Sequence, residues 1–452
     1  MALLYYTLGV LVFVVAMLAS IALHEVGHMV PARRFGGKVT QYFVGFGPTI
    51  WSKQVGETEY GVKAIPLGGY VKIIGMLPPG AEEVAEVETD ADGNQVMRVR
   101  KSNTGIFTQL VSDARAAEWE LVQPEDEPRL FYKLAWWKKV VVMAGGPTVN
   151  LLLAFLIFWG VFATAGNDND VRAEPVVESV SACVVPAAQD QRECTPAELR
   201  EHPSPAAAAG IEPGDRLVSW NGERVTSWTQ LQEWIRGNGS AAATLVVERD
   251  GAERTLDVTT QVTPRPLDPA APEKLEPVGF LGVTPVTEAR TGGPLYTLGQ
   301  MGGMVGETVE AIAVLPVKVW HVGMALVGLE ERDPNGPVSI VGGGRFAGEI
   351  AAHEDFPVQD KAVTLLGLIA GFNLFVGMFN FVPLLPLDGG HIAGALWEGM
   401  RRGWARLLRR PDPGHVDVAR LLPVAYVMTM AFVVMGIVLI LADLIIPVRL
   451  YG

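Results

Sequence analysis

Charge is scarce in this chain of 452 residues, and basic charge is scarcer than acidic. Charged residues make up 19% of the chain against 49% hydrophobic residues, which favours a membrane protein with sizeable soluble parts. The net charge of −13 argues against nucleic-acid binding, because nucleic-acid recognition needs a basic surface. Cysteine is also scarce: Cys183 and Cys194 are the only two. They lie close together, and we expect a disulfide that staples a local loop, with two unpaired thiols as the alternative.

Charged side chains are absent from residues 2–23, a run about long enough to cross the hydrocarbon core as a helix. The basic region that begins a cleavable signal peptide is missing, and the polar end of the run carries His-Glu where a cleavage site would need small residues. We therefore predict a retained span that continues to Phe35. Arg33, Arg34 and Lys38 follow it, which places the N-terminus outside and residue 35 in the cytoplasm.

The end of this span carries the motif His24-Glu25-Val26-Gly27-His28. In a helix His24 and His28 lie one turn apart on one face, so their imidazoles can share a zinc ion. Glu25 could then act as a general base on a water molecule activated by that ion. The alternative is a helix end that emerges among the lipid headgroups with its polar residues solvated. Because such residues are costly at membrane depth, we favour the zinc site.

A third protein ligand is expected, since a hydrolytic zinc site usually has three. Asp388 is the candidate, because it ends a second apolar run, residues 363–387, and precedes Gly389-Gly390. An N-cap of a following helix is the alternative role for Asp388, and His391 is a rival ligand. The arginines after Asp388 place this end in the cytoplasm as well, at the same membrane face as His24 and His28.

Between and beyond these motifs the pattern divides the chain into segments. Residues 39–75 show strand alternation with aromatic enrichment, and they could either form a plain cytoplasmic sheet or offer a strand edge to a peptide. Residues 306–328 could be a surface helix, a packed helix or a span.

The fold class expected is a polytopic α-helical membrane protein with about four transmembrane helices, a membrane-associated β segment and an extracytoplasmic PDZ-like β-rich domain. The expected segments are as follows: residues 1–35, first span with the zinc motif; 36–77, β segment; 78–130, partly ordered acidic cytoplasmic insertion; 131–166, interfacial segment and second span; 175–262, PDZ-like domain; 263–360, linker and surface or packed helices; 361–391, third span; 392–420, basic cytoplasmic loop; 421–446, fourth span, which returns the C-terminus to the outside.

These motifs together resemble the site-2 protease family of intramembrane zinc metalloproteases. The resemblance rests on the His24–His28 motif, on Asn380-Xaa-Xaa-Pro383 with Leu387-Asp388-Gly389, and on a PDZ-like domain between the second and third spans. Gly145-Gly146-Pro147-Xaa-Xaa-Asn150 and residues 335–340 look like the bacterial branch of this family.

The resemblance implies Zn²⁺ bound by His24, His28 and Asp388, with Glu25 as the base. It also implies substrate contacts from Asn380, from Asn373 and, in the strand segment, from Gly68 and Gly69. Implied substrates are single-span membrane proteins in the bilayer, such as anti-sigma factors already trimmed by a site-1 protease, or signal-peptide remnants. The protein is expected in the cell membrane, with its active site near the cytoplasmic side.

Two other classes of function compete with this hypothesis. A membrane-tethered PDZ scaffold with a structural zinc site would not need Glu25, which is no ligand, so its presence favours the enzyme. A transporter would have charged residues spread through several spans, and these are absent.

Overall fold

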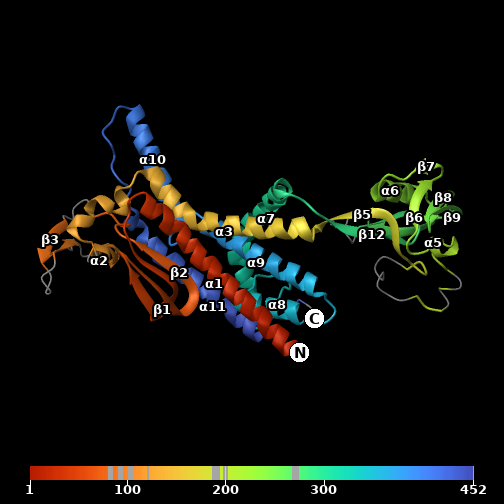
Figure 1. Cartoon of the computed structure of the whole chain (residues 1–452), viewed down its shortest axis with the longest axis horizontal. Coiled ribbons are helices and arrows are strands. Elements are labelled where there is room, and N and C mark those ends of the chain that lie inside the picture. The colour runs from red at the N-terminus through yellow and green to blue at the C-terminus, as the bar shows by residue number, and fades with distance from the viewer. Residues whose placement is uncertain are drawn as a thin grey trace. The chain divides into compact units, whose positions relative to one another are not determined.

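The computed structural model describes residues 1–79, 85–89, 95–99, 106–119, 122–185, 194–196, 199, 202–266 and 274–450. The chain divides into two compact units (Figure 1). The first comprises residues 1–161 and 292–452 and is called the helical unit here. The second comprises residues 162–291 and is called the β unit.

Five helices of the described chain are long and apolar enough to cross a membrane. Four match the expected spans: α1 (Ala2–Arg34), α3 (Trp136–Thr164), α9 (Val358–Asn380) and α11 (Leu422–Ile445). The fifth candidate is α7 (Pro294–Leu326), which the sequence left open as surface helix, packed helix or span. The structure thus contains one candidate span more than the four expected.

Small residues let the helices of the helical unit approach closely, as is common between membrane helices. At the crossing of α1 and α3, a Cβ added to Gly27 would lie 2.5 Å from the carbonyl oxygen of Gly145. The short helix α8 (Ile340–Ala352) packs on the first half of α1, where a Cβ on Gly9 would lie 2.2 Å from the carbonyl oxygen of Ala347. These contacts hold α1 between α3 and α8.

The β segment consists of two long antiparallel strands, β1 (Val39–Val55) and β2 (Thr58–Ile73). Both strands bend, so that residues 39–44 pair with residues 69–73 on one side and with residues 59–62 on the other. The later part of β1 pairs only with the first part of β2, which leaves residues 69–73 at one edge of the sheet. Tyr42 anchors the sheet to α1 by donating its hydroxyl proton to the carbonyl of Ala22, 2.8 Å away.

The acidic insertion is more ordered than its composition suggests. Its described parts form the hairpin β3 (Ala85–Thr89) and β4 (Gln95–Val99), then α2 (Ile106–Trp119) and the short 3₁₀ turn η1 (Pro124–Arg129). A second 3₁₀ turn, η2 (Phe131–Lys133), follows the insertion. Trp119 is buried with Ile74 and Leu130, and Asp126 binds Lys38 at 2.8 Å. Packing against the β segment and pairing with basic residues therefore order much of this insertion.

The expected basic loop is also largely helical. After α9 the chain makes a tight turn, and α10 (Asp388–Leu407) begins directly at Asp388. A 3₁₀ turn, η4 (Val418–Leu421), leads into α11. The arginines of this region decorate a helix, so the prediction of a loop over residues 392–420 is wrong for residues 392–407.

The β unit contains a sheet in the order β12-β5-β6-β8-β9, with β7 paired to β6. The bounds are β5 (Asn167–Val180), β6 (Arg216–Trp220), β7 (Glu223–Arg224), β8 (Ala242–Arg249), β9 (Ala252–Thr259) and β12 (Val283–Arg290). Helices α5 (Pro205–Ala208) and α6 (Trp228–Gly237) complete a core built on Leu217, Leu231 and Leu245. The β unit includes more residues than the expected 175–262, because β5 near its start pairs with β12 near its end.

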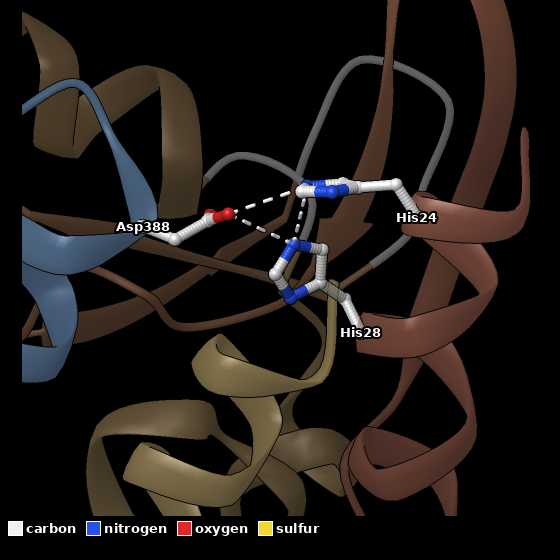
Figure 2. A group of neighbouring side chains, drawn as sticks. All are labelled: His24, His28 and Asp388. Atoms are coloured by element: carbon white, nitrogen blue, oxygen red, sulfur yellow. Dashed lines mark hydrogen bonds and ion pairs between the residues drawn. The ribbon is translucent and has the colours of Figure 1, made fainter. Parts of the chain in front are cut away.

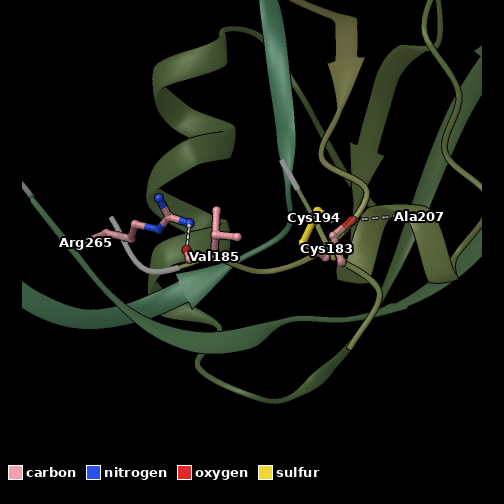
Figure 3. The surroundings of a disulfide bond; sticks show 6 residues. Cys183, Val185, Cys194, Ala207 and Arg265 are labelled. Carbon is pink, nitrogen blue, oxygen red and sulfur yellow. Dashed lines mark hydrogen bonds between the residues drawn. A yellow bond between two sulfur atoms is a disulfide. The ribbon is translucent and has the colours of Figure 1, made fainter. Parts of the chain in front are cut away.

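The expected linker after residue 262 is partly a hairpin of β10 (Gln261–Pro266) and β11 (Leu275–Phe280), and the rest of it, residues 267–273, lies outside the described residues. Cys183 and Cys194 form the expected disulfide (Figure 3). Nearby, Arg265 donates a hydrogen bond of 2.9 Å to the carbonyl of Val185. The staple therefore fixes the start of the connection that follows β5.

Candidate metal centre

Three side chains from the two ends of the helical unit's sequence meet at one point (Figure 2). The Nε2 atoms of His24 and His28 are 3.2 Å apart, and Oδ2 of Asp388 lies 3.3 Å from the first and 3.2 Å from the second. All three side chains are largely buried, with exposed fractions of 12%, 7% and 16%. Among the described residues this is the group of histidine, cysteine and acidic side chains that could hold a metal ion.

The local sequence explains how each ligand reaches this point. His24 and His28 are four residues apart in α1, so they share one face of the helix. Asp388 is the first residue of α10. The turn before it is so tight that a Cβ on Gly389 would lie 2.1 Å from the carbonyl oxygen of Val382. Glycine at this position therefore allows the backbone to bring the Asp388 carboxylate to the histidines.

Hydrogen bonds from neighbouring elements fix the tautomer of both histidines. Nδ1 of His28 lies 2.8 Å from the backbone carbonyl of Val142, which can only accept, so that nitrogen carries the proton. Nδ1 of His24 lies 2.6 Å from Oδ1 of Asn150, another acceptor. Asn150 in turn donates to Oδ1 of Asn373 at 3.1 Å. Both Nε2 atoms are thereby left with free lone pairs that point at Asp388.

This donor set fits zinc. Zinc sites have Zn–N and Zn–O distances of about 2.0–2.2 Å in a tetrahedron, which places ligand atoms roughly 3.3 Å from one another. The three observed separations, 3.2 to 3.3 Å, match that spacing. Two lone pairs and a carboxylate oxygen facing one another also need a cation between them, because no proton donor is available to all three.

A cavity of about 420 Å³ opens beside the three ligands. Glu25 lines it together with Gly68, Gly69 and Asn380, as does His391. Edge residues 69–73 of the β segment therefore run along the cavity, and a Cβ on Gly69 would lie 3.1 Å from Cγ of Glu25. The cavity thus has a carboxylate, an amide and a strand edge on its wall, beside the three metal-binding atoms.

The structure brings together His24, Glu25, His28, Asp388, Gly68, Gly69 and Asn380 as the sequence predicts. Asn373 is different: it is fully buried, does not line the cavity, and supports His24 through Asn150. Asn373 thus lies behind Asn150 in this hydrogen-bond chain, and its contact with substrate stays a prediction. His391 lines the cavity but is not one of the three converging ligands. Asp388 begins α10, yet its side chain points to the histidines and makes no cap hydrogen bond.

Two residues that shape the site, Asn150 and Gly146, are not predicted as site residues by the sequence. The sequence presents Asn150 only as part of a motif, and its position one helical turn after Gly146-Pro147 is the signal that could indicate its role beside His24. Gly146 was likewise noted without a role. A Cβ there would lie 2.3 Å from Nε2 of His28 and 2.6 Å from Nε2 of His24. The backbone of α3 thus forms one wall of the metal site.

Comparison with known proteins agrees with this geometry. The model of peptidase family M50 matches residues 12–407. The chain is 32% identical over 458 aligned residues to the zinc metalloprotease Rip1 of Mycobacterium tuberculosis, covering 99% of both chains. It is 30% identical to Rip1 of Mycolicibacterium smegmatis, again over 99% of both. Together with its apolar helices, these matches identify a multi-pass membrane enzyme that uses Zn²⁺. The chain belongs to peptidase family M50, the site-2 protease family, and is a zinc metalloprotease.

Proposed function

We propose that this protease hydrolyses a peptide bond within or near the transmembrane segment of single-span membrane proteins, with zinc held by His24, His28 and Asp388. The observation that carries the proposal is the meeting of these three side chains beside Glu25. His24 and His28 lie on the candidate span α1, and Asp388 begins α10, shortly after the candidate span α9 ends. When bound, zinc supplies Lewis-acid activation of water and of the scissile carbonyl.

The depth of the site supports cleavage inside the bilayer. Phe35 and Trp137 contact each other with ring centroids 5.4 Å apart, and the Nζ of Lys138 lies 5.3 Å from the Phe35 ring centroid. Aromatic and basic residues of this kind mark the membrane interface. Val142, whose carbonyl accepts from His28, lies five residues further along α3. At 1.5 Å per residue the site is about 7 Å inside the interface.

Four crossings, with α7 on the outer side, fit the contacts within the helical unit. Lys361 near the start of α9 lies over the ring of Tyr5 near the start of α1, so both helices start on one side of the membrane. Gly343 of α8, the helix before α9, faces Phe13 in the first half of α1. The end of α11 is on that side too, because Gly342 faces Asp443.

The helix α7 begins and ends on this side. Its end is tied to α11 by the pair of Arg332 and Asp443, 3.3 Å apart. Its start follows β12, whose last residue Arg290 pairs with Asn167, close in sequence to the end of α3. A few residues span at most about 3.6 Å each, so α7 starts near the point where α3 leaves the membrane. The arginines after Asp388 support a position of the zinc ligands near the cytoplasmic side, with both termini outside.

The remaining side chains supply positioning and proton transfer. Glu25 is the general base that takes a proton from the attacking water and returns it to the leaving amine. A substrate unwound into an extended strand pairs with residues 69–73, whose outer edge has no partner strand in the described chain. Asn380, which also lines the cavity, donates to the substrate backbone or to the oxyanion.

The decisive experiment replaces Glu25 with Gln in the purified full chain. Glu25 is not one of the three ligands, so Glu25→Gln should retain one zinc per chain while cleavage of a model single-span substrate falls by about 10²–10⁴-fold. Zinc is measured by elemental analysis and cleavage by gel electrophoresis. Turnover of Glu25→Gln at the wild-type rate would exclude the proposed base.

The β unit, PDZ-like in its expected class, acts as a size filter in this proposal. It admits single-span substrates, such as anti-sigma-like proteins, only after a site-1 protease has trimmed their outer domain. Because Asn167 and Arg290 are paired, a short linker can replace the residues between them. That deletion should allow cleavage of an untrimmed substrate that the intact chain rejects. A zinc-loaded deletion that still rejects it would contradict the filter.

A further inference from the structure

The proposed protease chemistry does not use a basic and aromatic pocket at the far end of α10. The helix and the segment after it carry five arginines, Arg401, Arg402, Arg406, Arg409 and Arg410. The same helix exposes large apolar side chains, which are 53% exposed at Trp397, 60% at Met400 and 67% at Trp404. A cavity of about 570 Å³ lies between this apolar face and the segment of Pro411 and Pro413. We propose that this pocket binds the headgroup of an anionic phospholipid.

The pocket lies at the level of the membrane interface. The backbone of α10 touches the start of α3, where a Cβ on Gly399 would lie 2.6 Å from the ring of Trp136. Next to Trp136 are Trp137 and Lys138, which contact Phe35 at the end of α1. Aromatic side chains flanked by basic residues are typical of the headgroup region. Trp397 and Met400, neighbours of Gly399, therefore lie where lipid headgroups are available.

Within the described residues the two arginines that line the pocket form no ion pair, whereas Arg402 beside them pairs with Glu398 and Asp412. Arg401 and Arg410 line the pocket, and Arg401 donates a hydrogen bond of 3.2 Å to the carbonyl of Pro413. Within the described part of the chain, no ion pair is formed by Arg406, Arg409 or Arg410. Guanidinium groups match phosphate oxygens in a bidentate geometry. An apolar wall beside unpaired guanidinium groups fits a molecule with an acyl chain and a phosphate, and so favours lipid over free phosphate.

Lipid in this pocket would act on the helix that begins with Asp388. The same helix is tied to α3 by Lys139, whose Nζ lies 2.7 Å from Oε2 of Glu398. Both side chains are buried. Lipid bound in the pocket would thus hold the C-terminal end of α10, whose first residue, Asp388, belongs to the metal site.

The test counts lipids bound to the full chain in detergent by native mass spectrometry, with dioleoyl phosphatidylglycerol or dioleoyl phosphatidylcholine as the probe. The anionic lipid should bind about tenfold more tightly than the zwitterionic one. Arg401→Gln with Arg410→Gln should remove that preference and leave phosphatidylcholine binding unchanged. The matched control, Arg224→Gln with Arg254→Gln, removes the same charge from exposed positions in the β unit and should keep the preference.

Three outcomes would overturn the proposal. Wild-type protein could bind both lipids equally, or the pocket variant could keep the preference for phosphatidylglycerol. Inorganic phosphate at the same concentration could displace the lipid, in which case the pocket is a phosphate site. If the glutamine variant melts early, Arg401→Lys with Arg410→Lys decides, because it keeps the charge but loses the bidentate geometry and should weaken the preference. A folded lysine variant with the full wild-type preference would also contradict the assignment. The readout requires no proteolysis, so it succeeds or fails independently of the proposed function.

Discussion

Two buried polar clusters on α10 have opposite electrostatic designs: one joins this helix to α1 and the other joins it to α3. In the metal site, His24, His28 and Asp388 direct two lone pairs and a carboxylate oxygen at one point. About ten residues further along α10, the Glu398 carboxylate is only 1% exposed but is surrounded by cations and donors. Lys139 lies 2.7 Å and Arg402 3.3 Å from it. In the second cluster the carboxylate already faces cationic side chains, whereas the first site needs a cation. Burial of charge alone therefore does not identify a functional site; the balance of charges does.

The largest effect expected from this comparison is on metal binding. Asp388→Asn keeps the shape of the side chain but replaces the carboxylate with a weak ligand, so zinc should fall from one to about one tenth per chain or less. Glu398→Gln makes the same chemical change in the other cluster and should leave zinc stoichiometric. Elemental analysis of both variants after purification decides. Equal zinc loss in the two would mean that the clusters act as one unit.

Two glycines of α3 allow the same comparison to be made with the backbone that borders the metal site, at Gly146, and away from it. A methyl group on Gly146 would lie 2.3 Å from Nε2 of His28, so Gly146→Ala should exclude zinc as effectively as removal of a ligand. Gly160 lies in the same helix, and nothing is within 4 Å of a Cβ at that position. Gly160→Ala should retain zinc and change the free energy of unfolding by about 1 kcal/mol or less. A zinc-loaded Gly146→Ala protein would show that the α3 backbone is not a wall of the site.

Stability, not metal, should respond to the second cluster. Removing one partner of a buried ion pair leaves the other uncompensated, so Glu398→Gln should lower the free energy of unfolding by about 3–5 kcal/mol. Glu57, exposed and paired with Arg129, provides the control, and Glu57→Gln should leave the free energy of unfolding nearly unchanged, because solvent screens exposed ion pairs. Thermal unfolding of the full chain in detergent measures both. Equal destabilisation by the two variants would contradict the distinction between buried and exposed pairs.

The same carboxylate predicts a dependence of stability on pH. Burial raises the pKa of Glu398, but hydrogen bonds from His415 and Lys139 outweigh it and lower the pKa from 4.5 to about 2. Because the pKa of Glu398 is lower in the folded than in the unfolded state, the ionised carboxylate stabilises the folded state at pH values above the unfolded pKa. This stabilisation is lost as pH falls toward the folded pKa. Melting temperature should therefore fall between pH 4.5 and about 2 in the wild type, by more than in Glu398→Gln. A parallel decline in both would assign the acid sensitivity elsewhere.

Asn150 should give the smallest effect. It orients His24 without touching the metal, and the loss of such a partner costs about 10–100-fold in metal affinity. Asn150→Ala should weaken zinc by that amount, and Asn373→Ala, one hydrogen bond further away, by less. Competition with a chelator ranks the two. If Asn373→Ala weakened zinc binding as much as Asn150→Ala, Asn373 would influence the metal site by more than its hydrogen bond to Asn150.

Local periodicity and spacing were enough to predict the four matched spans and the meeting of His24, His28 and Asp388. His24 and His28 are one turn apart, and Asp388 ends an apolar run at the same face, so each signal is short-range or set by topology. What could not be predicted depends on partners distant in sequence. Asn150 acquires its role only from His24. Similarly, Asp126 orders the acidic insertion through Lys38, and the β unit is closed by β5 and β12.

The contact of Gly27 with Gly145 has a consequence for how the enzyme is made. Since α1 and α3 meet backbone to backbone, they can pack as soon as both have entered the membrane, and they already present the two imidazoles. Asp388 follows only after the β unit, α7, α8 and α9 have been synthesised. The nascent chain therefore carries an incomplete metal site for most of its synthesis. We expect this order to keep a half-built protease harmless to the membrane proteins around it.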